Sequence, residues 1–343
     1  MSLGMAQQFS LFAEDPRPSP ARAPDRAAAH LFDPCSLPSP AKLGPKTRCF
    51  GTSSWVYPGW DGGVYRDVKA YGASSRFTEL CLAEYARSPH FRCAGADNMY
   101  YVRPSSRRKL LQKYASLLRP LPEKIALCPK VFHELTVSRY TLAQQEEWRI
   151  VDPINPHFLD PTLFLEEVAR PLLDELGDLL GPLILELQEN DIHEAEFCRL
   201  LDHFLSSIRK SFSGPISVEL RTDFHFTPRY LSILHSHGAA HVLNAWTRMP
   251  SIGDQFARMQ AVHKDWPVYV IRALLRIGMR YAEASKWAPY DRMYQRADAV
   301  RADILQVLRS LPIDHPAYVL VNNHLEGHAP TTVAEIQAEL FQT

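Results

Sequence analysis

The stretch "PLILELQENDIHEAEFCRLLDHFLSSIRKSFSGPISVELR" (residues 182–221) decides the fold class. Its two ends, residues 182–188 and 216–221, are short apolar runs that predict buried strands. Between these runs, apolar residues recur at helical spacing, at Phe197, Leu200, Leu201, Phe204 and Ile208. The stretch therefore predicts a strand, a helix and a second strand, which together form the βαβ unit of a parallel sheet.

The same unit repeats along the chain on both sides of this stretch. Strands are expected at residues 48–53, 94–101, 124–130, 182–188, 216–221, 240–246, 267–275 and 317–323, and a helical pattern follows each of them. Eight units in roughly 300 residues predict an α/β fold, a single TIM-type (β/α)8 barrel with insertions. A doubly wound open sheet is the alternative, but no Gly-rich GxGxxG turn follows the first strand.

Two helix starts are predicted from local signals. Asp160 and Pro161 match the N-cap and first-turn residues of one helix. Thr332 and Glu335 have the spacing of a capping box, which predicts the start of the last helix at this point.

The first 46 residues differ in composition from the rest of the chain. They are dense in Pro, Ala and Ser, and such a segment buries too little apolar surface to offset its ordering entropy. We expect a flexible, partly disordered arm over residues 1–46 and a barrel domain over residues 47–343. A partner-binding role for the arm is the functional alternative.

Charge and cysteine usage limit the function classes. Lys+Arg and Asp+Glu each number 38, so a global polyanion-binding surface is not indicated. No apolar run reaches the roughly 20 residues that span a bilayer, so no membrane contact is expected. The six cysteines form no CxxC pair, which favours a reducing, cytoplasmic compartment.

The histidines give no metal-site pattern at the expected site. His235 and His237 form an HSH sequence, but they follow a short helix, away from the ends of the strands where an active site is expected. We therefore expect no bound metal and no cofactor.

Polar residues end most of the predicted strands. Active sites of (β/α)8 barrels lie at these C-terminal ends, and a charged residue in an apolar strand is costly unless it is paired or faces a site. The candidate catalytic residues are Glu219, Glu186 and Lys130. The candidate ligand-binding residues are Arg221, Arg272, Trp55, Tyr57, Tyr101, His133, Asn244, Asn322 and Asn323.

Glu219 and Arg221 are central to this candidate site. Residues two apart share a face of a strand, so both are expected to face the barrel interior while Val218 and Leu220 face the helices. Arg221 and Arg272 together would hold one anion. The alternative is a buried structural ion pair between Glu219 and Arg221.

The stretch "GTSSWVYPGW" (residues 51–60) places three aromatic residues directly after the first strand. Trp55, Tyr57 and Trp60 are expected to form an aromatic wall at the rim, which suits stacking on a sugar or a nucleobase. The alternative is a packed loop whose rings lie against the next helix.

Several of these segments together resemble the YecE-like family, the domain of unknown function numbered 72. The matching segments are "GTSSWVYPGW" (51–60), "YYVRPS" (100–105), "CPKVFHELT" (128–136), "VELR" (218–221), "VIR" (270–272) and "YVLVNNHLEGHAP" (318–330). The resemblance covers about residues 48–341 and implies a TIM-barrel-like fold, while the activity of the family is not established.

The chain departs from the family pattern at four places. Ser54 stands where the family usually has Gly, and Gly95 and Asp97 match its strand-two E-x-N. Glu186 matches a usual Gln, and Arg272 is followed by "ALL" where the family reads R-x-H-G. A typical glutamate and a typical histidine are therefore missing, which suggests a divergent branch.

Two functions are compatible with these residues, and the sequence leaves open whether the protein is an enzyme. The first is binding of a small anionic ligand, phosphorylated, sugar-like or nucleotide-like, at the barrel mouth, with hydrolysis as its extension. A nucleic-acid fragment is a further ligand class with weaker support. The alternative is a non-catalytic protein that binds a ligand or a partner there, with residues 136–160 as a lid or an interface.

Overall fold

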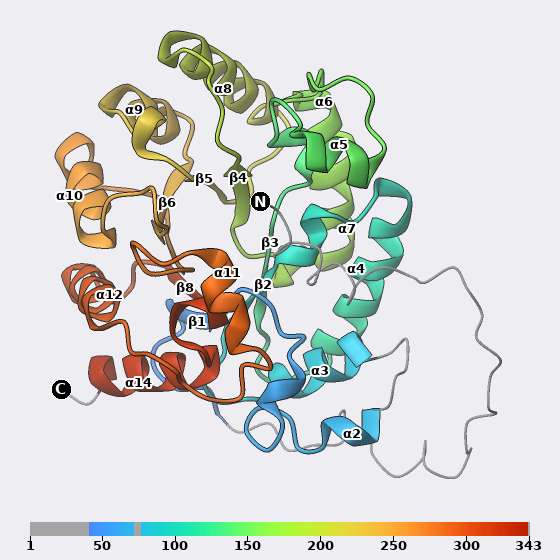
Figure 1. Ribbon diagram of the computed structural model, residues 1–343, viewed down its shortest axis with the longest axis vertical. Helices are drawn as coiled ribbons and strands as arrows, with labels where there is room; N and C mark the ends of the chain where they lie inside the picture. Colours follow the sequence, from blue (N-terminus) through green and yellow to red (C-terminus); the bar gives the residue numbers. More distant parts are fainter. Residues whose placement is uncertain (1–40, 72–76, 342–343) are drawn as a thin grey trace.

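The protein is described here by a computed structural model that covers residues 41–71 and 77–341 (Figure 1). Every strand pairing in this part of the chain is parallel. The strands are β1 (Arg48–Thr52), β2 (Cys93–Ala96), β3 (Ala126–Pro129), β4 (Leu183–Leu187), β5 (Ile216–Leu220), β6 (Ala240–Ala245), β7 (Tyr269–Ala273) and β8 (Ala317–Val321). The eight expected strands are therefore confirmed, in an α/β fold with parallel pairing.

The strands form two hydrogen-bonded sheets. One has the order β1-β8-β7-β6-β5-β4, and β2 pairs with β3 in the other. Single bridges, Leu127 to Leu180 and Lys130 to Ile184, join the β3 region to the β4 region. Beside β1 and β2, the Arg92 amide donates to the Phe50 carbonyl at 2.8 Å. Continuous ladders do not close the ring, so the closed barrel stays a prediction.

Helices surround the strands, as Figure 1 shows. They are α2 (Val68–Tyr71), α3 (Phe77–Tyr85), α4 (Pro104–Leu118), α5 (Leu142–Trp148), α6 (Pro161–Leu163), α7 (Arg170–Leu176), α8 (Glu194–Ile208), α9 (Pro228–Ser236), α10 (Ile252–Val262), α11 (Tyr281–Ala284), α12 (Asp298–Ser310), α13 (Asn323–Glu326) and α14 (Ala329–Phe341). A π-helical turn, Phe164–Ala169, joins α6 to α7. In the described residues no helix is both long and apolar enough to cross a membrane.

The strands are buried on both faces, which explains their apolar composition. Every residue of β4, β5, β6 and β7 is buried, as expected when other parts of the fold cover both faces of a parallel sheet. The charged residues of these strands, Glu186, Glu219 and Arg272, lie near their C-terminal ends, whereas the polar Ser217 and His241 lie near the N-terminal ends of β5 and β6. We call the C-terminal end of the parallel strands the mouth.

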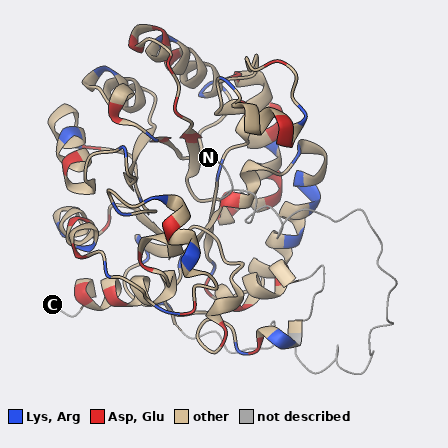
Figure 2. Ribbon diagram, viewed as in Figure 1, with Lys and Arg blue, Asp and Glu red and all other residues tan. Residues whose placement is uncertain are grey.

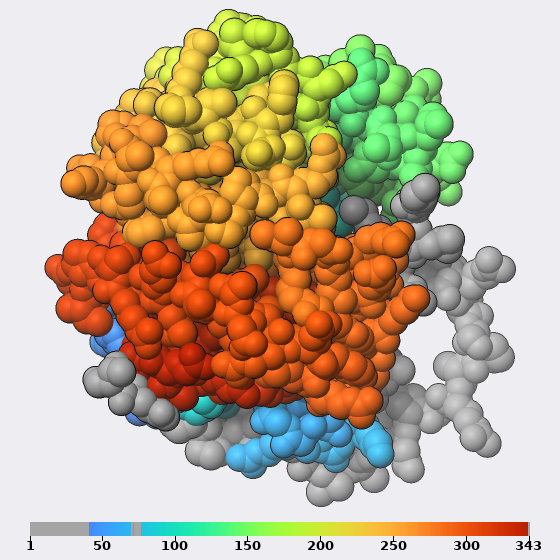
Figure 3. Space-filling view, turned by 60° about the vertical axis from the view of Figure 1, so that its left-hand side comes forward, coloured from blue at the N-terminus to red at the C-terminus, as the bar shows by residue number. Residues whose placement is uncertain are grey.

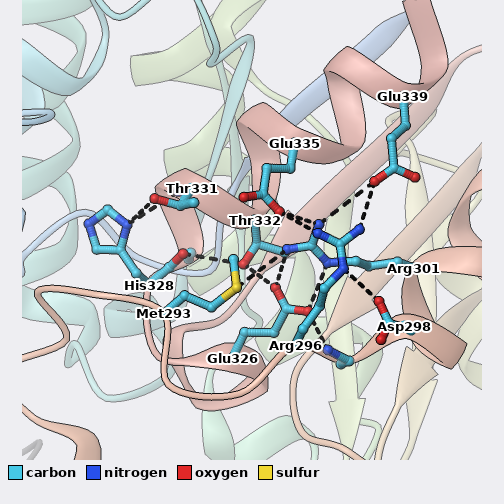
Figure 4. Close-up of polar contacts among 12 residues, drawn as sticks. Met293, Arg296, Asp298, Arg301, Glu326, His328, Thr331, Thr332, Glu335 and Glu339 are labelled. Atoms are coloured by element: carbon cyan, nitrogen blue, oxygen red, sulfur yellow. Dashed lines mark hydrogen bonds and ion pairs between the residues drawn. The ribbon is translucent and has the colours of Figure 1, made fainter.

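One predicted helix start is confirmed and the other is wrong. Asp160 caps α6, since its side chain accepts from the amides of Thr162 and Leu163. By contrast, α14 begins at Ala329, before Thr332. The Thr332 hydroxyl donates to the buried Glu326 carboxylate at 2.6 Å, and this bond replaces the expected capping box (Figure 4).

Strand β2 is shorter than predicted. It ends at Ala96, and Asp97–Tyr100 form a turn of 3-10 helix instead of its last residues. This turn carries the Asp97 carboxylate away from the strand direction and toward the mouth.

The last residues of the expected arm pack against the domain. The Lys42 ammonium donates to the carbonyls of Ala86 and Ser88, which follow α3, at 2.5 and 2.6 Å. Arg92 also donates to the Gly44 carbonyl at 2.9 Å. Because a buried ammonium needs such partners, residues 41–46 belong to the folded domain, and the remainder of the arm lies outside the described residues.

Candidate functional site

Six charged side chains meet at the mouth, and we call them the mouth cluster. They are Asp97, Lys130, Glu186, Glu219, Arg221 and Arg272. Strand register explains part of this convergence, because Glu186 of β4 lies directly beside Glu219 of β5. Figure 2 shows most other charged residues spread over the surrounding helices.

Arg272 of β7 is the centre of the mouth cluster. Its Nη1 donates to Glu219 Oε2 at 2.6 Å and to Glu186 Oε2 at 3.1 Å. Its Nη2 donates to Asp97 Oδ2 at 2.6 Å. The Arg272 side chain is 1% exposed, so its charge depends on these three carboxylates for compensation.

Glu186 is held by three cations. Lys130 Nζ lies 2.8 Å from its Oε1, and Arg221 and Arg272 both reach its Oε2. Burial alone would raise the pKa of Glu186, but attraction to Arg221, Lys130 and Arg272 outweighs it and lowers the pKa well below the usual range. Glu186 is therefore a permanent carboxylate at neutral pH and cannot donate a proton.

This lowered pKa makes stability depend on pH. The pKa of Glu186 is lower in the folded protein than in the unfolded chain, where it is about 4.3. Its contribution is therefore complete above about pH 5 and is lost as the pH falls below about 4. We expect the difference in free energy of unfolding between wild type and Glu186→Gln to shrink between pH 5 and pH 3, measured by urea denaturation. A difference that stays constant over this range would contradict this role of Glu186.

Four buried polar atoms of the mouth cluster have no hydrogen-bond partner among the described residues. The donors are Arg221 Nη1 and Arg272 Nε, and the acceptors are Asp97 Oδ1 and Glu219 Oε1, although Glu219 Oε1 lies 3.0 Å from Arg221 Nη2 as an ion pair. Three further buried atoms at or near other strand ends also lack a hydrogen-bond partner among the described residues: Ser53 Oγ, His133 Nδ1 and Asn244 Oδ1. Buried polar atoms are nearly always hydrogen-bonded, so this end of the strands has capacity for a polar ligand.

Comparison with known proteins identifies the family. A family model described as "Protein of unknown function DUF72" matches residues 49–343. The chain belongs to the DUF72 family. No curated protein matches the chain.

Two solved DUF72 structures resemble the chain. The protein from Thermotoga maritima is 19% identical, with a TM-score of 0.54 over 86% of this chain and 99% of that one. The protein from Enterococcus faecalis is 15% identical, with a TM-score of 0.54 over 86% of this chain and 96% of that one. At these identities the likeness establishes the fold alone.

The structure explains one departure from the DUF72 pattern. Gly95 has no space for a side chain, because a Cβ there would lie 2.7 Å from the Ser53 carbonyl oxygen. The neighbouring Asp97 instead supplies the strand-two carboxylate and pairs with Arg272. The carboxylate that the sequence interpretation found missing from this strand is therefore supplied by Asp97, in the turn that follows β2.

The prediction of an aromatic wall at the rim is wrong for Trp55 and Trp60. Trp55 and Trp60 are each 1% exposed. The Trp55 indole donates to the Thr78 carbonyl at 3.1 Å, and Trp60 stacks on Tyr65 and Tyr85. Both indoles belong to the core because the helices after β1 pack over them, as in the packed-loop alternative.

Tyr57, Tyr101 and His133 lie beside the mouth. Tyr57 is partly buried, with its ring 5.7 Å from that of Tyr290. Burial raises the pKa of Tyr101, and the nearby Tyr100, Glu186 and Asp97 add to this effect. The His133 ring stacks on Trp148 of α5 at 4.1 Å. The insertion at residues 136–160 therefore packs next to the mouth cluster.

The three predicted asparagines hold backbone groups. Asn244 donates to the Leu220 carbonyl at 3.0 Å, and Asn322 caps α13. Asn323 accepts from the Ala329 amide at 2.8 Å, across the turn at Gly327. Asn322 and Asn323 thus have structural partners, and a ligand role for them stays a prediction.

Sequence reasoning did not assign four residues to the site: Asp97, His324, Tyr281 and Tyr290. Asp97 and His324 directly follow strands β2 and β8, so their positions at strand ends could have identified them as site residues. Tyr281 and Tyr290 lie in the second insertion, residues 276–297, whose course no pattern predicts. This insertion reaches Tyr57, and a Cβ on Gly59 would lie 2.1 Å from the Pro289 carbonyl oxygen. Figure 3 shows the insertion at the surface, above the blue residues after β1.

Proposed function

We propose that the protein binds a small ligand with an anionic group at the mouth of a closed (β/α)8 barrel. The observation that carries this proposal is the unpartnered Nη1 of Arg221, which is buried at the mouth. A guanidinium presents planar donors that suit a carboxylate or phosphate group. The side chain is 13% exposed, so it remains within reach of a ligand.

Arg221 is held in place for this task. Its Nη2 pairs with Glu186 and lies 3.0 Å from Glu219 Oε1. Its guanidinium lies over the Trp246 ring, 4.3 Å from the centroid. Lys130 and Arg272 are committed to carboxylates within the mouth cluster, so we assign anion contact to Arg221 and a positioning role to Glu186 and Glu219.

The charge balance of the mouth cluster favours a ligand with a single negative charge. Three cations, Lys130, Arg221 and Arg272, face three carboxylates. A second negative charge on the ligand would meet Glu186 and Asp97 without a further cation. Groups that carry a single negative charge fit this charge balance: a carboxylate, a phosphodiester or a phosphate monoester with one proton bound.

Hydrolysis of such a ligand is the second candidate function. Asp97 Oδ1 has no partner among the described residues, and a carboxylate in this position can act as a base toward water. Of the predicted catalytic residues, Glu219 and Lys130 remain candidates, whereas Glu186 is fully ionised and serves as an electrostatic group. A non-catalytic binding protein needs only the Arg221 contact.

The described cysteines are free thiols, which supports our proposal of a reducing, cytoplasmic compartment. We keep a nucleic-acid fragment as a weaker ligand candidate, and we propose no metal or cofactor for the mouth.

Arg221→Lys is expected to separate ligand binding from folding. Lysine keeps the positive charge but lacks the second planar N–H donor of the guanidinium. The variant should therefore lose one charge-assisted hydrogen bond to the ligand. Such a bond contributes about 1.5–3 kcal/mol, which corresponds to a loss of roughly tenfold or more in affinity. The unliganded melting temperature should stay nearly unchanged. Inorganic phosphate and gluconate should each stabilise the variant less than wild type in thermal-shift titrations.

The matched control is Arg199→Lys, an exposed arginine paired with Glu196. This control should behave as wild type in both measurements. If Arg221→Lys melts at a much lower temperature and the anion effect persists, the pair with Glu219 is structural and the proposal fails.

A further inference from the structure

A second group of polar side chains lies at the mouth, after β8 and beneath the second insertion. His324 Nδ1 lies 2.8 Å from Asn322 Oδ1, and His324 Nε2 lies 2.9 Å from the Tyr290 hydroxyl. His324 is 4% exposed. We call Tyr290 and His324 the Tyr–His pair.

The contacts of Asn322 fix the protons of the Tyr–His pair. The backbone amide of His324 donates to the same Asn322 atom at 3.0 Å, so that atom is the amide oxygen. An oxygen only accepts, and therefore His324 Nδ1 carries the proton and Nε2 is the acceptor. The Tyr290 hydroxyl donates to Nε2. The Ser285 hydroxyl, 3.5 Å from Nε2, is a second hydrogen-bond partner of Tyr290, so one lone pair of the Tyr290 oxygen remains for a ligand donor.

The Tyr–His pair is uncharged at neutral pH. Burial lowers the pKa of His324 to about 4, and burial raises the pKa of Tyr290 to about 12. This pair therefore differs from the mouth cluster, since it offers polar atoms without net charge. Such a pair suits a hydroxyl group better than a second anionic group.

Tyr281 connects the Tyr–His pair with the mouth cluster. Its ring centroid lies 4.5 Å from that of His324. Burial raises the pKa of Tyr281, a hydrogen bond with Ser285 opposes this rise, and the negative charge of Asp97 adds to it. In Figure 1, α11, which begins at Tyr281, lies in front of β8.

The backbone of Tyr290 is an additional sign of a functional position. Its φ of 66° lies in the left-handed region, which is unfavourable for a bulky L-residue. Such conformations persist where surrounding contacts impose them, and they concentrate at ligand sites. Here the contacts are the His324 bond and the edge of the Tyr57 ring.

We propose that Tyr290 and His324 form a hydroxyl-binding subsite, so that the ligand is a polyhydroxylated acid, either a sugar phosphate or a sugar acid. This inference rests on the proposed function, because Arg221 would hold the anionic group of the same ligand. The Tyr290 oxygen accepts from a ligand hydroxyl while its own O–H group donates to His324 Nε2. The rings of Tyr57 and Tyr281 offer apolar faces for the carbon skeleton.

The test is calorimetric titration of the full chain with four probes: inorganic phosphate, glucose, glucose 6-phosphate and glucuronate. Wild type should bind at least one of the two sugar acids about tenfold or more tightly than phosphate, and the better of the two identifies the anionic group. Tyr290→Phe should lose most of this advantage, about five- to tenfold, with phosphate affinity unchanged. His324→Phe should show the same pattern, because it keeps a ring but removes the acceptor that orients Tyr290.

Tyr294→Phe is the matched control, since Tyr294 lies in the same insertion and stacks on Trp287. It should keep wild-type affinity for all probes, and all variants should keep the wild-type circular dichroism spectrum. Equal affinity of wild type for phosphate and both sugar acids would overturn the subsite while leaving the proposed function intact. Equal losses for phosphate and sugar acids in Tyr290→Phe and His324→Phe would overturn it too. Absence of binding for every anion would instead overturn the proposed function.

Discussion

Arg272→Met is expected to lower the free energy of unfolding by about 3–5 kcal/mol, as found when one partner of a buried ion pair is removed. The substitution leaves Asp97, Glu186 and Glu219 facing one another with two cations in place of three. Glu219 is affected most, because its side chain is 0% exposed and its shortest contact is to Arg272. Urea denaturation at pH 7 measures the effect.

The control is Arg199→Met, which removes an equally short ion pair to Glu196 at the surface, where both side chains are about half exposed. Exposed pairs contribute about 0–1 kcal/mol, so this variant should remain close to wild type. Adding Glu219→Gln to Arg272→Met should restore part of the loss, because it removes one uncompensated charge. Similar losses for Arg272→Met and Arg199→Met would show that the mouth cluster is not held by Arg272.

The convergence of the charged residues could be predicted from the sequence. The two-residue period places Glu219 and Arg221 on one face of β5, and parallel strands bring their C-terminal ends together. The structure confirms that Glu186, Glu219, Arg221 and Arg272 meet. The alternation of side chains along a strand depends only on neighbouring residues, so it can be predicted from a single sequence.

The partners within the cluster could not be predicted, because they depend on distances between strands. The sequence interpretation assigned both arginines to one anion, whereas Arg272 has three carboxylate partners. Asp97 reaches Arg272 only because β2 ends at Ala96 and a 3-10 turn follows. Similarly, Tyr290 reaches His324 through an insertion without a repeating pattern.

The last helix shows how tertiary contacts override a local signal. The spacing of Thr332 and Glu335 fits a capping box, but both side chains are engaged by residues from elsewhere in the chain. Thr332 donates to Glu326, and Glu335 accepts from Arg296 and Arg301 (Figure 4). These residues form the Glu326 network, whose centre is the buried carboxylate of Glu326.

Glu326 joins three segments that are distant in sequence. Its Oε1 accepts from the Ala297 amide at 2.5 Å and from Arg301 Nε at 2.8 Å, and its Oε2 accepts from Arg301 Nη2 at 2.5 Å. Its backbone carbonyl accepts from the Tyr294 amide at 2.7 Å. The network therefore fixes the end of the second insertion, and with it the approach of Tyr290 to the mouth. Gly327 follows with a φ of 108°, and a Cβ there would lie 2.6 Å from the Tyr294 ring.

Glu326→Gln is expected to lower the free energy of unfolding by about 3 kcal/mol or more, because it leaves the Arg301 guanidinium, which is 2% exposed, without its buried counter-charge. The amide also places donors opposite the donors of Arg301 and Ala297. Glu339→Gln is the matched control, since it makes the same change on a partner of Arg296 that is 42% exposed, and it should cost about 1 kcal/mol or less. Urea denaturation at pH 7 compares the two variants. If Glu326→Gln is as stable as Glu339→Gln, the buried carboxylate does not hold the insertion, and the left-handed backbone of Tyr290 must be imposed by its contacts at the mouth alone.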